Sequence, residues 1–244
     1  MKIYHEGAKV TLKGDNSPVT QADVEAEDII LKGLAALDPD TPVIAEEAVA
    51  GGKEPKASPR FYLVDPLDGT REFISGNGEF TVNIAVIEEG EPVCGVIFAP
   101  AIGRLFCGAK GQGAWKADFA VGDKFDETVW QKFETPALPD KGVIAVASRS
   151  HRDQETQDWL EAKQVDEIVS AGSSLKFCLV ATGEAHLYPR FGRTMEWDTA
   201  AGHGIVVAAG GQVLTLDGTP LRYGKEERGF DNPAFFVSSA ATAS

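Results

Sequence analysis

Residues 61–70 constrain the fold of this chain more than any other stretch. They read Phe-Tyr-Leu-Val-Asp-Pro-Leu-Asp-Gly-Thr, so an apolar and aromatic run leads directly to Asp65 and Asp68. The run predicts a buried strand. The proline after Asp65 fixes its own φ and favours extended geometry at Asp65, which predicts a sharp turn with both carboxylates at the end of a sheet. Gly69 and Thr70 are then expected to open a helix.

This strand exit carries the residue types of a phosphate site. Carboxylates bind hard cations and the free N–H groups of a helix N-terminus bind anions, so together they suit a phosphate bound with Mg²⁺. Asp-Pro and Asp-Gly are also common in ordinary turns, which leaves a purely structural interpretation open for the isolated dipeptides. Acidic residues elsewhere in the chain decide between a phosphate site and an ordinary turn.

The length and charge of the chain limit its class and its partners. With 244 residues it can form one large α/β domain or two smaller halves. The net charge of −14 argues against a nucleic-acid polymer as partner, because two polyanions repel each other. A small phosphorylated substrate stays compatible with this charge, since bound cations reverse the field locally.

The cysteines and the N-terminal segment predict a cytoplasmic protein. Three cysteines cannot all pair, and Cys94, Cys107 and Cys178 each lie among apolar residues, which favours buried, reduced thiols. Their spacing matches no zinc site. The N-terminus has no apolar segment of signal-peptide length, and no run of about 18 apolar residues predicts a membrane span.

The first half of the chain begins with a long helix. Thr20 and Asp23 have the spacing of a capping box, and apolar residues recur at helical spacing as far as Leu37. Further elements expected in this half are a strand at 43–45, a polar loop at 51–60 and a meander of antiparallel strands at 81–115.

After a polar connection at 118–141, the pattern changes to alternating strands and helices. The expected elements are strands at 143–147, 167–170 and 185–188, and helices at 153–162, 173–182 and 198–209. This alternation predicts a layered α/β arrangement. We therefore expect two halves, 1–135 and 136–244.

Four acidic residues hold positions that suit a metal site: Glu46, Asp65, Asp68 and Asp198. Glu46 and Asp65 each follow a short apolar strand, so their side chains meet if those strands are neighbours in one sheet. Asp198 begins a predicted helix, where a short acid also serves as an ordinary N-cap. Asp23 has the same alternative, because its spacing from Thr20 fits a capping box.

Three of these acids lie in two longer motifs. The motifs read Leu63-Val-Asp65-Pro-Leu-Asp68-Gly-Thr70 and Trp197-Asp198-Thr-Ala-Ala-Gly202. Both resemble the signatures of the magnesium-dependent, lithium-sensitive phosphatases of the inositol monophosphatase superfamily. Within it the chain is most similar to the bacterial 3′(2′),5′-bisphosphate nucleotidases, through segments 15–20, 71–74, 77–84, 148–151, 172–179 and 188–191. The resemblance implies an α/β fold, a layered αβαβα sandwich with an N-terminal antiparallel-sheet half that binds metal and a C-terminal α/β half that sets specificity.

The resemblance also implies a set of metal ligands made only of oxygen. Glu46, Asp65 and the backbone carbonyl of Leu67 would bind a first Mg²⁺. Asp65, Asp68 and Asp198 would bind a second, with Asp65 as the bridge, and some relatives hold a third ion near Glu46. An all-oxygen set suits a hard cation.

A catalytic pair follows from the same resemblance. Thr70 and Asp23 would be hydrogen-bonded, and together would orient and deprotonate a water on the first metal. The N–H groups of Gly69 and Thr70 would bind phosphate oxygens, with no covalent intermediate.

Substrate contacts are expected from the second half of the chain. Ser173 and Lys176 place a hydroxyl and an ammonium close together, and Arg190 follows an apolar strand, so the three suit a second phosphate. Plainer interpretations are an N-cap for Ser173 and a solvated helix face for Lys176. His151 either stacks on an adenine or is an ordinary histidine of a surface loop.

The activity implied by the resemblance is removal of the 3′-phosphate of adenosine 3′,5′-bisphosphate, with the related phosphosulfate of sulfur metabolism as a further candidate. An inositol or sugar monophosphate phosphatase with the same metal site is the alternative, and a catalytically silent phosphate-binding protein is a third hypothesis. A homodimer is left open. Relatives carry an additional helix before the segment that matches residues 1–13, so this chain is expected to begin without it.

Overall fold

The computed structural model describes residues 1–7, 9–12, 14, 18–53, 55–124, 126–148 and 154–239. Its α-helices are α1 (Lys2–Glu6), α2 (Gln21–Leu37), α3 (Glu46–Ala50), α4 (Thr70–Ser75), α5 (Gln154–Ala162), α6 (Leu175–Ala181) and α7 (Glu196–Ala208). Its strands are β1 (Val10–Leu12), β2 (Pro18–Thr20), β3 (Val43–Ala45), β4 (Arg60–Asp68), β5 (Thr81–Glu88), β6 (Glu91–Ala99), β7 (Arg104–Ala109), β8 (Gly113–Asp118), β9 (Gln131–Phe133), β10 (Ile144–Ser148), β11 (Glu167–Ala171), β12 (Leu187–Arg190), β13 (Gln212–Thr215) and β14 (Phe235–Ser238). Two 3₁₀ turns are η1 (Glu127–Val129) and η2 (Glu226–Arg228).

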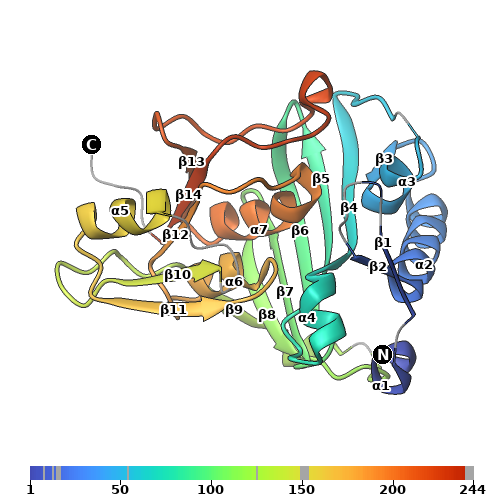
Figure 1. Ribbon diagram of the computed structural model, residues 1–244, viewed down its shortest axis with the longest axis horizontal. Coiled ribbons are helices and arrows are strands. Elements are labelled where there is room, and N and C mark those ends of the chain that lie inside the picture. Colours follow the sequence, from blue (N-terminus) through green and yellow to red (C-terminus); the bar gives the residue numbers. More distant parts are fainter. Residues whose placement is uncertain are drawn as a thin grey trace.

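The elements stack in the order helix, sheet, helix, sheet, helix (Figure 1). The sheet of β10–β14 has α5 on its outer side, and α6 and α7 lie between this sheet and the larger sheet of β3–β9. The far side of the larger sheet is covered by α2 and α3. The predicted αβαβα sandwich is therefore confirmed.

The larger sheet places two of the acidic residues side by side. Its strand order runs from β3 to β9 in sequence, with β3 parallel to β4 and every later pair antiparallel. Ala45 pairs with Val64. Glu46, the residue after β3, and Asp65, the next residue along β4, therefore lie side by side at the point where β3 ends. The expected meander and the expected strand neighbours are both observed.

The smaller sheet has the order β11-β10-β12-β14-β13. Its first three strands are parallel, and β14 runs antiparallel between β12 and β13. The sequence pattern did not predict β13 and β14. Strands of four residues are too short for a readable alternation, and the pairing partners of β14 lie far away in the chain.

Close contact with the larger sheet fixes the position of α7. A Cβ atom at Gly95 on β6 would overlap the backbone of Ala201, and one at Gly202 would overlap the ring of Phe177 on α6. Glycine at both positions lets the helix touch the layers on either side of it. Since α7 carries Asp198 in its first turn, this packing also places that carboxylate.

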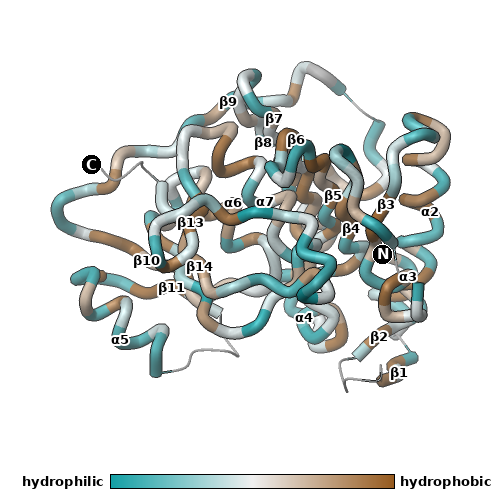
Figure 2. The backbone as a smooth tube through the Cα atoms, turned by 90° about the horizontal axis from the view of Figure 1, so that it is seen from above, coloured by the Kyte–Doolittle hydropathy of each residue, from teal (hydrophilic) through white to brown (hydrophobic). Residues whose placement is uncertain are grey.

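The N-terminal elements confirm one prediction and add one helix. Thr20 and Asp23 form the predicted capping box at the start of α2, whose colours in Figure 2 alternate between hydrophilic and hydrophobic, as expected of a helix with one face on a sheet. The short helix α1 was not predicted. It places the ring of Tyr4 5.2 Å from that of Phe73 and 5.0 Å from that of Phe80, so it packs beside α4.

The exit of β4 differs from the prediction. The strand does not turn at Pro66 but continues to Asp68, with irregular pairing to β5 between Asp65 and Asp68. The proline falls in this irregular stretch, where its missing N–H breaks no regular ladder. The chain turns instead at Gly69, whose φ of 91° is left-handed, and α4 starts at Thr70 as predicted.

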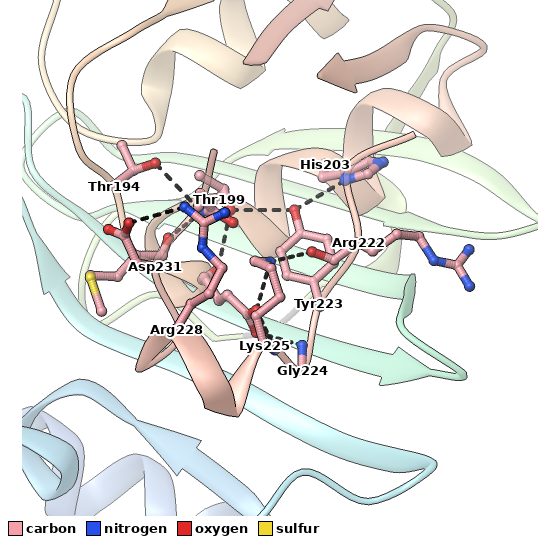
Figure 3. Close-up of polar contacts among 12 residues, drawn as sticks. Thr194, Thr199, His203, Arg222, Tyr223, Gly224, Lys225, Arg228 and Asp231 are labelled. Carbon is pink, nitrogen blue, oxygen red and sulfur yellow. Dashed lines mark hydrogen bonds and ion pairs between the residues drawn. The ribbon is translucent and has the colours of Figure 1, made fainter. Parts of the chain in front are cut away.

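A buried polar network attaches α7 to the C-terminal segment. The hydroxyl of Tyr223 lies 3.3 Å from Oγ1 of Thr199 and 3.0 Å from Nδ1 of His203 (Figure 3). Burial lowers the pKa of His203 to about 3, with a smaller contribution from the cations of Arg222 and Lys225. The imidazole is therefore neutral in the folded protein near neutral pH.

We expect His203 to make the protein acid-sensitive. Folding depresses the pKa of His203 from 6.5 to about 3, so on acidification the unfolded chain binds the proton at a higher pH than the folded protein does. The free energy of unfolding therefore falls as the pH drops below 6.5. At pH 5 the loss is about 2 kcal/mol. The free energy of unfolding, measured with urea at pH 7 and at pH 5, should differ less between the two pH values for His203→Gln than for the wild type. An equal difference in the two proteins would show that His203 is not the source of the acid sensitivity.

Candidate active site

A pocket of about 210 Å³ lies where the end of β4 meets α4, α6 and α7. The predicted site residues that line it are Glu46, Asp68, Gly69, Thr70, Ser173, Lys176, Arg190 and Asp198. They come from both predicted halves of the chain, although they are distant in sequence. Other residues of the lining, including Arg71, Thr194 and Thr199, were not singled out by the sequence analysis.

The carboxylates form one electrostatic cluster. Burial raises the pKa of Asp65 well above its usual value, and the negative charges of Glu46, Asp68 and Asp198 raise it further. Burial also raises the pKa of Asp198, with Asp68 and Glu46 as the next causes. Such mutual effects require that the four groups lie close together.

Backbone groups hold two of these carboxylates in place. Leu67 N–H donates to Oδ1 of Asp65 at 2.9 Å, and Met195 N–H donates to Oδ2 of Asp198 at 2.8 Å. The helix α7 starts at Glu196, two residues earlier than predicted, so Asp198 is its third residue and not its first. The N-cap residue is Met195, so Asp198 is not the N-cap that the plainer interpretation supposed, although its carboxylate does accept the N–H of that residue.

Glu46 is placed by a carboxylate from α2. The helix α3 starts at Glu46 without a side-chain cap of its own. Glu27, which is buried, accepts a hydrogen bond from the N–H of Glu47 at 2.7 Å and so supplies the missing cap. This contact ties the first turn of α3 to α2.

The donor set fits a divalent hard cation. The clustered side chains offer only carboxylate oxygen, and a cation would relieve their mutual repulsion. Two buried oxygens on β5, Oγ1 of Thr81 and Oδ1 of Asn83, have no hydrogen-bond partner among the described residues, and these two residues pair with Asp68 and Asp65. The waters that Mg²⁺ retains are natural donors to such oxygens. Within the described ranges no three acidic, histidine or cysteine side chains stand at metal-ligand spacing, so these carboxylates would have to draw together to bind a cation.

Asp23 and Thr70 are hydrogen-bonded across the fold. Oγ1 of Thr70 donates to Oδ1 of Asp23 at 3.1 Å. The other oxygen of Asp23 accepts from the N–H and the hydroxyl of Thr20, at 2.9 and 2.6 Å. One carboxylate therefore serves as helix cap and as partner of Thr70, so the two interpretations of Asp23 do not exclude each other.

The cationic wall of the pocket lies on α6 and β12. Lys176 is buried, which contradicts a solvated helix face, and its Nζ donates to the carbonyl of Ser173 and lies 5.4 Å from the ring centroid of Tyr188. Burial lowers the pKa of Lys176 to about 8, although Asp68 opposes this. Arg190 donates to the carbonyl of Arg193 at 3.0 Å, and its buried Nε has no acceptor in the part of the chain that the structure describes.

Ser173 is outside the helix that was expected to begin with it. Its φ of 45° is left-handed, and α6 starts only at Leu175 after Ser174. The carboxylate of Glu79 accepts the N–H of Gly172 at 2.8 Å and so holds this strained turn. The side chain of Ser173 therefore lines the pocket from a loop and is not the N-cap of α6.

Sequence reasoning missed two buried donors, Ser174 and Asn83. The hydroxyl of Ser174 lies 2.5 Å from Oδ2 of Asp68, and Nδ2 of Asn83 lies 2.8 Å from the same hydroxyl. Both stand in segments quoted for the resemblance, yet nothing in their local pattern distinguishes them from ordinary polar residues. His151 lies outside the described residues, so its predicted role stays a prediction.

Comparison with known proteins identifies the family of this chain. The sequence pattern of the inositol monophosphatase family matches residues 1–239. The chain belongs to the inositol monophosphatase family. The 3′(2′),5′-bisphosphate nucleotidase CysQ of Escherichia coli K12 is 46% identical over 241 residues, which are 98% of this chain and 93% of that protein. This confirms the resemblance found in the sequence.

Solved structures of the inositol monophosphatase family share the fold. CysQ from Bacteroides thetaiotaomicron has a TM-score of 0.77 and 42% identity, over 94% of this chain and 87% of that one. An IMPase of Thermotoga maritima has a TM-score of 0.76 over 98% and 85% of the two chains, and its 24% identity supports the fold alone.

The two remaining predictions concern the cysteines and the membrane. Cys94, Cys107 and Cys178 are free thiols, and burial raises the pKa of each. No helix in the described part of the chain is both long and apolar enough to span a bilayer.

Proposed function

We propose that the protein is a Mg²⁺-dependent 3′(2′),5′-bisphosphate nucleotidase that converts adenosine 3′,5′-bisphosphate to AMP. The observation that carries this proposal is one pocket lined by two kinds of charged group, the carboxylates Glu46, Asp68 and Asp198 and the cations Lys176 and Arg190. A substrate with two anionic groups matches that division of charge. The identity of 46% to two proteins named 3′(2′),5′-bisphosphate nucleotidase CysQ supports it.

Within this proposal the cation ligands are the acids of the cluster. Glu46, Asp65 and the carbonyl of Leu67 would hold one Mg²⁺, and Asp65, Asp68 and Asp198 a second. Bound there, Mg²⁺ would neutralise phosphate charge and activate water for attack on phosphorus. A third ion near Glu46 belongs to the same proposal.

Asp23 and Thr70 are proposed to handle the proton of the attacking water. Oγ1 of Thr70 can accept that proton only if its own proton moves to Oδ1 of Asp23, 3.1 Å away. Thr20 holds the other oxygen of Asp23, so the carboxylate is fixed for this transfer. The free N–H groups of Gly69 and Thr70 at the start of α4 would bind phosphate oxygens.

Ser173, Lys176 and Arg190 are proposed to bind the second anionic group. The buried Nε of Arg190 lacks an acceptor, and a bound phosphate would supply one. A phosphosulfate also carries anionic oxygen at that position, so the corresponding adenosine phosphosulfate is proposed as a further substrate. An inositol monophosphate has no second anionic group and would leave these residues unused.

Lys176→Met is expected to lower kcat/KM for adenosine 3′,5′-bisphosphate by about ten- to a hundredfold, because it removes a charge-assisted hydrogen bond worth about 1.5–3 kcal/mol. The unbranched methionine fills the buried space of the lysine stem. Activity on inositol 1-phosphate should change little in the same variant. An equal loss on both substrates, or no loss on the bisphosphate, would favour the alternative of an inositol or sugar monophosphate phosphatase.

A further inference from the structure

Two buried side chains join the acidic cluster across the interface of the two halves. Ser174 precedes α6, and Asn83 lies on β5 of the larger sheet; each is 1% exposed. The hydroxyl of Ser174 is 2.5 Å from Oδ2 of Asp68 and 2.6 Å from the backbone carbonyl of Asp198. Nδ2 of Asn83 is 2.8 Å from that hydroxyl and 3.4 Å from Oδ2 of Asp68.

The chemistry of the partners fixes which atoms donate. An ionised carboxylate and a carbonyl only accept, so Ser174 must point its single proton at Asp68 or Asp198. The amide nitrogen of Asn83 must likewise face Ser174 and Asp68, with one N–H for each. The amide therefore occupies one lone pair of the hydroxyl and directs its proton toward the two acceptors.

This arrangement determines the orientation of Asp68. Asp68 is the last residue of β4, after an irregular stretch of pairing and next to the left-handed Gly69. Hydrogen bonds from hydroxyl to carboxylate at this distance are short and strong. Because Ser174 reaches both Asp68 and the carbonyl of Asp198, it also sets how far α7 stands from the end of β4.

We propose that Ser174 and Asn83 are positioning residues, which fix the carboxylate of Asp68 and tie the first turn of α7 to it, so that Asp68 and Asp198 are oriented to bind a cation. The proposal rests on the proposed function only in taking Asp68 and Asp198 as cation ligands. Neither residue is among those that line the pocket, so we expect their effect to pass through the cation ligands. The free Oδ1 of Asn83 is left available to a water of that cation.

Binding of Mn²⁺ alone, followed by the EPR signal of the free ion, tests the proposal without substrate. Ser174→Ala should weaken Mn²⁺ binding by about ten- to a hundredfold, the usual effect of removing a hydrogen bond to a metal ligand. Asn83→Ala should weaken it as well, and the double variant should lose less than the product of the two effects because they act on one carboxylate. Ser174→Thr keeps the hydroxyl and should retain most of the affinity.

Kinetics in saturating Mg²⁺ give a second readout. Ser174→Ala should then recover much of its kcat, with KM for adenosine 3′,5′-bisphosphate nearly unchanged, whereas a purely structural defect would not respond to added cation. Ser170→Ala, on the exposed side of β11, is the matched control and should behave as the wild type. If Ser174→Ala does not fold, Asn83→Ala decides by the same two measurements.

The outcomes separate this inference from the proposed function. Wild-type Mn²⁺ affinity in both Ser174→Ala and Asn83→Ala, with the wild type active on the bisphosphate, would overturn the positioning role alone. A lower melting temperature with unchanged Mn²⁺ affinity would show a structural role and also overturn it. A wild type that neither binds Mn²⁺ nor releases phosphate would refute the proposed function and this inference with it.

Discussion

Asp65→Asn is expected to lower turnover by at least about a thousandfold while the fold survives. Asp65 is proposed to bridge two cations, and several kcal/mol of charge stabilisation in the transition state would be lost with it. The fold should tolerate the change, because asparagine still accepts the N–H of Leu67 and one of four repelling charges is gone. The measurements are phosphate release from adenosine 3′,5′-bisphosphate and the melting temperature.

The control for Asp65→Asn is the same substitution at an exposed aspartate. Asp40 lies on the surface after α2, so Asp40→Asn should change neither quantity. Turnover of Asp65→Asn close to that of the wild type in Mg²⁺ would refute the bridging role. A large fall in melting temperature would show that the carboxylate is needed for folding instead.

Thr70→Ala and Asp23→Asn should each lower kcat by about a hundred- to ten-thousandfold, the range of general acid–base contributions. Their effects should combine to much less than the product, because either change breaks the same proton path. Asp23→Asn separates the two roles of this residue: asparagine caps a helix about as well, so α2 should keep its stability.

Thr20→Ser serves as the control for the catalytic pair. It keeps a hydroxyl at the start of α2 and should leave turnover within a few-fold of the wild type. Serine and threonine both cap helices, so the stability of α2 should change little. Full activity of Asp23→Asn would show that Asp23 is only a helix cap. Strictly multiplicative losses in the double variant would show that Asp23 and Thr70 act separately.

The sequence predicted the parts of this site that depend on strand order and on short spacing. Glu46 and Asp65 could be paired because each follows an apolar run of strand length, and the parallel pairing of β3 with β4 places them together. The capping box of Thr20 and Asp23 could be read from a spacing of three residues. These features depend on local rules that hold in any fold.

The features that were missed depend on the tertiary structure. Lys176 follows a helical pattern that also fits a solvated face, and only the packing of α6 between the two sheets buries it. Ser174 acquires its role from Asp68 and Asp198, which are distant in the chain. The left-handed turn at Ser173 is held by Glu79, so no local propensity would have indicated it.

Phosphate release from adenosine 3′,5′-bisphosphate and from inositol 1-phosphate, measured side by side on the wild type, tests the central claim most directly. We predict a kcat/KM at least about a hundredfold higher for the bisphosphate, because only it engages Ser173, Lys176 and Arg190. Release should stop in EDTA and return with Mg²⁺. A preference for inositol 1-phosphate, or release that persists in EDTA, would contradict the account.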